Sequence, residues 1–325
     1  MSDHHVLLTH AFRSLSARLG QDPLQVQGPG GNTSIKDAET MWIKASGTEL
    51  ARAEAENIFV AVDRQAAVAE AQGRSGNGDC KTTVLDATST LRPSIETTFH
   101  AVLDHVVVAH THSVATLVHA ISPEGRAACG DKLAGLPFVM VPYAKPGLPL
   151  TRKILEAISN ETQVIILQNH GLICCGGTVD EVSGLIGEVE RRLSLPVQDI
   201  GDRELTSPAP AEFVWADESW IAFDRRTRDL VAAGSYYPDH VVFLGPGLPD
   251  RDHAGHPPAI IHEGEGIALR ADATPAQKAM LRCLSDVLIR LPYDWSAEAI
   301  GLEAEAELMN WDAEKYRQSL AAEKS

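Results

Sequence analysis

The sequence predicts an α/β or α+β domain, in which helices pack on a central sheet. Three observations favour this class. Apolar runs of strand length, such as FVMV and VIILQ, recur up to about residue 200. Segments with helical periodicity and recognisable start signals lie between these runs. Glycine-rich and polar turns separate the two kinds of segment, as expected of a folded domain.

The first elements follow in order from the N-terminus. Residues 4–19 have the pattern of an amphipathic helix, and Gly20 is expected to end it. After the glycine-rich turn QGPGGNTS, strands are predicted around residues 41–44 and over NIFVAVD at 57–63. The segment 71–90 is polar and broken by glycine, so we expect a loop there.

The alternation continues along the chain. Pro93 and Ser94 are expected to open a helix with the sequence SIETTFHAVLD, and HVVVAHTH reads as a strand followed by another helix. FVMV, VIILQ and LICC are further predicted strands, with the turn NHG between the last two. Thr178 and Glu181 have the spacing of a capping box for a helix that ends near Leu193.

The character of the chain changes after about residue 200. We therefore expect one domain over residues 1–200 and a C-terminal extension over 201–325. In the extension, RELTSPAPAEF reads as a linker or a surface excursion, WIAFD, LVAAG and VVFLG as short strands, and the part from about Ala297 as helical. No motif in this extension predicts chemistry.

The composition excludes several classes of partner. Of the 325 residues 44% are hydrophobic, which is enough for a large core, and no apolar run reaches the ~20 residues of a membrane span. Acidic residues outnumber Lys and Arg by 44 to 28, so the net charge of −16 disfavours nucleic acid and anionic membranes. Five irregularly spaced cysteines and an N-terminus unlike a signal peptide predict a reducing cytoplasm.

The run HVVVAHTHS carries the strongest chemical signal. His110 and His112 are separated by one residue, so on a strand their rings point to the same side. A packed core histidine is the ordinary alternative, but each of the two would need its own polar partner in an apolar strand. His170, in the turn NHG, offers a third imidazole. Three imidazoles around one divalent ion leave a coordination position open, which is typical of a catalytic site.

Glu96 allows two interpretations. It is either a solvated glutamate in the first turn of a helix, where its charge favours the helix dipole, or a general acid/base near the metal. His100 lies one turn later on the same face, as a neighbour or as a residue that supports the site. Cys174 and Cys175 stand in an apolar run and are predicted to be buried rather than nucleophilic.

The turns GPGGNTS, at 28–34, and KASGTE, at 44–49, are rich in small donors. Such turns can present successive N–H groups to an anion, although each alone is an ordinary turn. Lys44 and Arg92 would add positive charge there unless they are surface residues. Neither a phosphate-binding P-loop nor the GxGxxG fingerprint occurs, so a nucleotide cofactor has no support.

Together these segments resemble the class II aldolase/adducin family. The matching pieces, in order, are GGNTS, KASGTE, PSIE with the following FH, HTH and NHGL, and they span about residues 5–195. The C-terminal part, with YYPDHVVF and ELMNWDAEKYRQSL, is similar to the end of the aldolase half of bifunctional rhamnulose-phosphate aldolase/dehydrogenase proteins. We expect no dehydrogenase half in this chain.

The resemblance implies a central, mainly antiparallel sheet flanked by helices, and a homotetramer with sites at subunit interfaces. It implies that His110, His112 and His170 bind the metal and that Glu96 is the catalytic acid/base. Zinc is expected first, with manganese, iron and cobalt as alternatives, because imidazole accepts all of them. The resemblance also implies a phosphate-binding role for five residues: Gly31, Asn32, Ser46, Gly47 and Ser94.

Two features depart from the family pattern. Many members that use phosphorylated substrates have a serine pair before the glutamate, and here Ile95 replaces the second serine. We therefore expect a small anionic substrate and leave open whether it is phosphorylated. Fuculose-phosphate aldolases also use a tyrosine from the neighbouring subunit as an acid. We find no match for it in this sequence, because Tyr143 belongs to a different segment.

The resemblance implies a metal-dependent lyase that cleaves a carbon–carbon bond of a hydroxyketone through a metal-stabilised enediolate, as in a sugar-phosphate aldolase. A decarboxylase of a 3-oxo acid or a dehydratase would use the same residues. An adducin-like interaction module without catalysis is the alternative from another class of protein. The presence of all three histidines and of Glu96 favours the enzyme.

Overall fold

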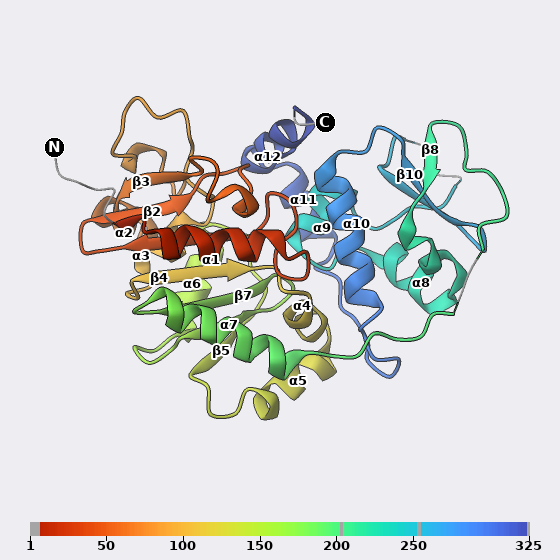
Figure 1. Cartoon of the computed structure of the whole chain (residues 1–325), viewed down its shortest axis with the longest axis horizontal. Helices are drawn as coiled ribbons and strands as arrows, with labels where there is room; N and C mark the ends of the chain where they lie inside the picture. Colours follow the sequence, from red (N-terminus) through yellow and green to blue (C-terminus); the bar gives the residue numbers. More distant parts are fainter. Residues whose placement is uncertain (1–6, 202–203, 252–254, 324–325) are drawn as a thin grey trace.

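The structure is a computed structural model and describes residues 7–201, 204–251 and 255–323. Its centre is a seven-stranded sheet with the strand order β3-β2-β1-β4-β7-β6-β5 (Figure 1). Every neighbouring pair is antiparallel except β5 and β6, so the predicted mainly antiparallel sheet is confirmed. The strands are β1 (Asn32–Lys36), β2 (Thr40–Lys44), β3 (Phe59–Asp63), β4 (Val107–Thr111), β5 (Phe138–Val141), β6 (Val164–Leu167) and β7 (Gly171–Gly176).

Helices cover both faces of this sheet, and Figure 1 shows α1 and α7 lying across one of them. Phe12 of α1 and Val189 of α7 share an apolar cluster with Val107 of β4. Phe99 of α3 belongs to a second cluster with Val108. Successive residues of β4 therefore face opposite layers. The helices are α1 (His10–Gln21), α2 (Arg64–Ala71), α3 (Thr97–Val102), α4 (Val114–Ala120), α5 (Pro123–Lys132), α6 (Leu148–Ala157) and α7 (Val179–Leu193).

β1 is a strand where the sequence predicts only a glycine-rich turn. It lies between β2 and β4 in the middle of the sheet, and all five of its residues are buried. Its polar side chains have buried partners, since Thr33 hydrogen-bonds Ser16 at 2.7 Å and Ser34 hydrogen-bonds His100 at 2.8 Å. A strand that buries polar residues lacks the apolar pattern by which strands are predicted.

The first helix also differs from its prediction. α1 continues through Gly20 to Gln21, and the predicted residues 4–6 lie outside the described part of the chain. A Cβ atom at Gly20 would clash with the backbone nitrogen of Ala51. The glycine therefore allows α1 to approach the short 3₁₀ helix η2 (Leu50–Arg52) rather than ending the helix.

Two helix starts are corrected in detail. α3 begins at Thr97, which places Glu96 at its N-cap rather than in its first turn. Thr178 caps α7 as predicted, because its side chain accepts a hydrogen bond from the N–H of Glu181 at 3.2 Å. The Glu181 carboxylate instead accepts from the N–H of Gly177, at 2.8 Å, so only one half of the capping box forms.

The strand predictions for the C-terminal extension are wrong. WIAFD lies in the 3₁₀ helix η4 (Asp217–Phe223) and continues to Asp224, LVAAG overlaps the end of α8 (Arg225–Ala233), and VVFLG overlaps the end of α9 (Pro238–Leu244). Short apolar runs do not distinguish strand from helix. The start signals decide here, since the Asp224 side chain caps α8 and Pro238 opens α9.

The strands of the extension form a separate antiparallel sheet in the order β8-β10-β9. The helical prediction for the part from about Ala297 is confirmed, because α11 and α12 lie there. These elements are β8 (Phe213–Trp215), β9 (Ala259–His262), β10 (Gly266–Arg270), α10 (Pro275–Leu288), α11 (Leu302–Met309) and α12 (Asp312–Ala322).

The extension shares a core with the first part of the chain. Val114 and Leu117 of α4 belong to the same apolar cluster as Val241 of α9 and Leu284 of α10. α4 follows the HTH segment directly, so this shared core places the extension next to that segment. No helix in the described ranges is both long and apolar enough to cross a bilayer.

Candidate metal centre

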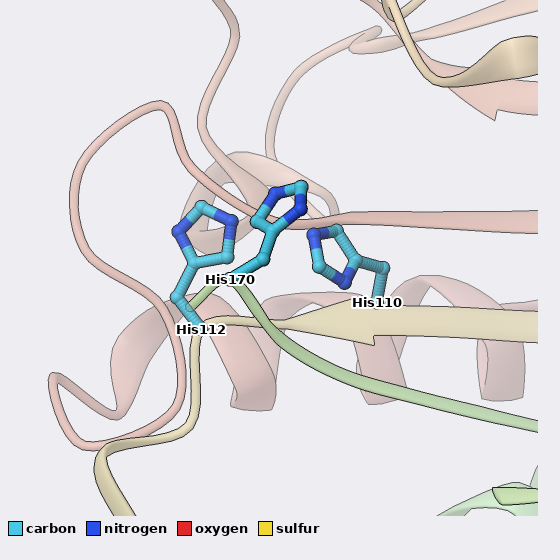
Figure 2. A group of neighbouring side chains, drawn as sticks. All are labelled: His110, His112 and His170. Atoms are coloured by element: carbon cyan, nitrogen blue, oxygen red, sulfur yellow. The ribbon is translucent and has the colours of Figure 1, made fainter. Parts of the chain in front are cut away.

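Three predicted histidines meet at one end of the central sheet (Figure 2). His110 lies in β4, His112 directly after it, and His170 in the turn between β6 and β7. All three side chains are buried, and each offers a ligand nitrogen within 4.8 Å of the other two. The ring centroids are 4.9 Å apart for His110 and His170, and 5.0 Å apart for His110 and His112.

The NHG turn explains how His170 reaches the other two. Asn169 adopts a left-handed conformation with φ 53°, and its amide donates to the carbonyls of Tyr236 and Glu298 at 3.0 and 2.7 Å. Gly171 has φ 153°, and a Cβ atom there would clash with the carbonyl oxygen of Thr111. Only glycine allows this close approach of the turn to β4.

The imidazoles of His110 and His170 are neutral and can each offer a lone pair. His110 Nδ1 lies 3.0 Å from the carbonyl oxygen of Leu172, so Nδ1 carries the proton and donates it there. Its Nε2 is buried and has no hydrogen-bond partner among the described residues. Burial lowers the pKa of His110 and lowers that of His170 to about 3, so both rings are neutral near pH 7. Neutral imidazole is the form that binds a metal.

Glu96 lies between two of these rings. Its Oε2 is 3.5 Å from His110 Nε2 and its Oε1 is 3.5 Å from His170 Nε2. The side chain is buried, so Glu96 is not a solvated surface glutamate. Burial raises the pKa of Glu96, but His110, His170 and the amide of Asn32 lower it, and the net shift is downward.

A hydrogen-bond chain from β1 and α3 orients Glu96. Asn32 Nδ2 donates to Glu96 Oε2 at 2.8 Å, and Asn32 Oδ1 accepts from His100 Nε2. His100 Nδ1 in turn accepts from the Ser34 hydroxyl at 2.8 Å. Burial lowers the pKa of His100 well below its usual value, so the ring is neutral and this direction of the chain is consistent. His100 thus supports the site through Asn32. Among the described residues it forms no hydrogen bond to the three clustered histidines.

The five residues predicted to bind phosphate line the same pocket as Glu96, His112 and His170. The free volume of this pocket is only about 30 Å³. Lys44 also lines it, and its ammonium donates to the carbonyls of Pro29 and Thr48 at 2.8 and 2.7 Å. Burial lowers the pKa of Lys44 to about 7. The phosphate-binding roles stay a prediction for these residues: Gly31, Asn32, Ser46, Gly47 and Ser94.

The sequence analysis missed a group of site residues in the C-terminal extension. Asp239 Oδ2 of α9 lies 3.3 Å from His112 Nδ1. Arg317 of α12 pairs with Asp239 and with Glu314, each at 2.8 Å, and all three side chains are buried. Burial raises the pKa of Asp239, but Arg317 and His112 outweigh it and lower the pKa. No local pattern predicts a contact between residues so far apart in sequence.

The donor set fits a divalent metal ion. His110 and His170 are neutral imidazoles with a buried unpaired nitrogen, and ring nitrogens of His110 and His112 face a carbonyl and a carboxylate; both features are typical of histidines that hold zinc or a related ion. Residues that would hold it are His110, His112 and His170. The five cysteines are free and buried, as expected for Cys174 and Cys175, and none belongs to the cluster.

The fold and the cluster define a class of protein in which a mainly antiparallel sheet carries a three-histidine site. The chain belongs to the Class II Aldolase and Adducin N-terminal domain family, whose model matches residues 12–196, more than half of the 325 residues. The family resemblance drawn from the motifs is thereby confirmed.

Solved structures of other proteins are similar to part of this chain. The N-terminal class II aldolase domain of a conserved protein from Thermoplasma acidophilum is 25% identical, with a TM-score of 0.50 over 56% of this chain and 90% of that chain. L-fuculose-1-phosphate aldolase from Thermus thermophilus is 18% identical, with a TM-score of 0.41 over 58% of this chain and 92% of that chain.

A curated relative is much longer than the region it shares. The uncharacterized oxidoreductase YuxG of Bacillus subtilis (strain 168) is 31% identical over 174 residues, which are 49% of this chain and 25% of YuxG. The match thus spans about a quarter of the length of that relative.

Proposed function

We propose that this protein is a metal-dependent lyase that cleaves a carbon–carbon bond of a hydroxyketone, with a sugar phosphate as the first substrate class to examine. The observation that carries the proposal is the cluster of three buried imidazoles with Glu96 between two of them, His110 and His170. Family membership supports a lyase of the class II aldolase type. The proposed cofactor is one divalent ion, with zinc first and manganese, iron or cobalt as alternatives.

The chain's own residues have distinct tasks in such a reaction. A divalent ion held by the histidines would supply a Lewis acid that polarises the substrate carbonyl. Glu96 would move a proton to or from the carbon next to that carbonyl. Glu96 Oε2 accepts a hydrogen bond from Asn32, whereas Glu96 Oε1 has no hydrogen-bond partner among the described residues. We therefore assign the proton transfer to Oε1. Ser46 and Ser94 would orient substrate oxygens in the pocket.

The same residues would also support another reaction, the decarboxylation of a 3-oxo acid, since that reaction needs a polarised carbonyl too. The homotetramer with a site at a subunit interface stays a proposal as well. An adducin-like module would have no use for a buried carboxylate held between two imidazoles, and this geometry is our reason to prefer an enzyme.

Exchange of Glu96 for glutamine tests the proposed chemistry. Purified protein is first screened with ketose phosphates and 3-oxo acids, with detection of the cleavage products. Glu96→Gln should retain the bound ion and lose at least about 10²-fold in turnover, because glutamine cannot carry the proton. Glu156→Gln, an exposed glutamate on α6, serves as the matched control. Undiminished turnover of Glu96→Gln would refute the acid/base role.

A further inference from the structure

The pocket lined by Glu96, His112 and His170, which we call the metal pocket, is too small to hold a whole substrate. A water molecule needs roughly 10–15 Å³ of such free volume, so about 30 Å³ admits little more than an ion and one or two waters. The Asn32 amide is already engaged, since Nδ2 donates to Glu96 Oε2 at 2.8 Å and to Ser94 Oγ at 3.3 Å, and Oδ1 accepts from His100. The remainder of any sugar-sized ligand must therefore lie outside this pocket.

A larger hollow adjoins the metal pocket. The two share three lining residues, Ser46, Ile95 and Pro146. The hollow has a volume of about 460 Å³, within the range of roughly 300–1,000 Å³ that is usual for small-molecule sites. Ile95 lies at the junction, so an apolar side chain stands between the two spaces.

Two cations without acidic partners line this hollow. The guanidinium of Arg92 lies 3.9 Å from the centroid of the Tyr316 ring, and the ammonium of Lys145 lies 4.7 Å from that of Trp311. In the described part of the chain neither cation forms an ion pair, whereas Lys81, on the same wall, pairs with Asp79 at 2.9 Å. The aromatic rings hold the cations in place without neutralising their charge.

We propose that this hollow, which we call the cationic hollow, binds the anionic end of the substrate, a phosphate or a carboxylate, through Arg92 and Lys145. The hydroxyketone end then reaches the metal pocket past Ser46 and Ile95. The aromatic rings that position the cations come from the C-terminal segment, at Trp311 and Tyr316. The extension thus supplies specificity, and the proposal deepens the lyase function, on which it rests.

The net charge of the whole chain makes the position of Arg92 and Lys145 informative. With a net charge of −16 the surface repels an anion on average. Two unpaired cations lining one hollow next to the metal pocket give an anionic substrate a local site with a defined direction. A neutral substrate would accept hydrogen bonds from them without the charge attraction, so the hollow favours an anionic substrate.

The first experiment measures the anion site alone. Inorganic phosphate is titrated by calorimetry into the metal-free full chain at low salt. Arg92→Gln and Lys145→Gln should each weaken binding about tenfold, because each removes one charge-assisted contact. Arg225→Gln, which removes an exposed arginine on α8, is the matched control and should bind as the wild type does. Equal binding by all four proteins would overturn the proposal.

The second experiment tests the connection to the metal pocket. Zinc-loaded protein is titrated with acetohydroxamate and with the monohydroxamates of succinic and adipic acid, which chelate an ion at one end and carry a carboxylate at the other. A tailed probe should bind about tenfold tighter than acetohydroxamate, and Arg92→Gln should remove that advantage. A parallel series with phosphate tails shows which anion the hollow prefers.

The outcomes separate the two proposals. If phosphate binding depends on Arg92 and Lys145 but no tail improves a chelating probe, the hollow does not serve the metal pocket and the inference is wrong. If the protein binds no zinc, the lyase proposal fails, whereas the phosphate titration still decides whether the anion site exists. His110→Gln should abolish zinc binding and leave the phosphate titration unchanged.

Discussion

His112 and Asp239 form the contact that links the C-terminal extension to the imidazole cluster. A carboxylate that accepts the second ring proton of a metal-binding histidine fixes the tautomer and makes the other nitrogen a better ligand. Asp239 is held for this task by Arg317, and both are buried. The pair would therefore act on a bound metal ion through His112 rather than by touching it.

Asp239→Asn should weaken metal binding about 10- to 100-fold, because the amide is a poorer acceptor for the His112 ring proton. Competition with a chelating dye measures the affinity. Asp272→Asn, which changes an exposed aspartate paired with Arg270, is the control. Unchanged affinity of Asp239→Asn at unchanged thermal stability would show that Asp239 has no part in the site.

The site residues that the sequence predicts are those whose spacing is local. His110 and His112 are separated by one residue at the end of β4, and Glu96 and His170 belong to recognisable motifs. Asp239 and Arg317 carry no such signal, since their roles depend on how α9 and α12 pack against β4. Long-range ion pairs of this kind become visible only with the fold.

Among the elements, the NHG turn between β6 and β7 has the strictest local requirement. It places His170 beside β4 because Gly171 approaches the carbonyl of Thr111 so closely that a side chain does not fit. The polar strand β1 matters as much, since it carries Asn32 opposite His110 in the sheet register. The sequence did not predict β1 because its buried residues are polar. The same polarity lets β1 contribute Asn32 to the site.

Gly171→Ala should destabilise the fold by ~1–3 kcal/mol and lower metal affinity, because its φ of 153° and the contact with Thr111 are both unfavourable for alanine. Urea unfolding measures the free energy. Gly130→Ala, at an exposed position of α5 where an added Cβ meets nothing within 4 Å, is the matched control and should be neutral or slightly stabilising. Equal stability of the two variants would contradict the role of the turn.

The helices of the extension show where prediction fails for whole elements. WIAFD, LVAAG and VVFLG are apolar runs of strand length, but the structure holds all three in helices; the Asp224 cap starts the helix that contains LVAA, and Pro238 opens the helix that contains VVFL. The strands of the central sheet were predictable because they alternate with turns, as in the segment that ends with LICC. Apolar content alone therefore does not decide between strand and helix.

Across the whole molecule, two buried lysines couple folding to pH. Lys36 has no hydrogen-bond partner for its ammonium among the described residues, and burial lowers its pKa from 10.5 to about 7. Burial also lowers the pKa of Lys44 to about 7. The unfolded chain keeps these protons up to about pH 10, so it binds more protons than the folded chain above pH 7. The free energy of unfolding therefore rises with pH in this window.

Lys36→Met should reduce this rise, which amounts to at most ~1.4 kcal/mol per pH unit for each lysine, and should stabilise the protein most at pH 7 and below. Urea unfolding at pH 7, 8 and 9 gives the slope. Lys153→Met, at an exposed lysine of α6 that pairs with Glu156, should leave the slope as it is in the wild type. A slope that is the same in all three proteins would show that Lys36 keeps its proton throughout.

The proposed function depends on His110, His112 and His170 holding one divalent ion together. Elemental analysis and X-ray absorption of the full chain, purified without added metal and then exposed to zinc, test this binding. We expect one ion per chain with three imidazole nitrogens at about 2.0–2.1 Å for zinc, lost on His110→Gln. A protein that takes up no ion, or that binds one through cysteine sulfur, would contradict it.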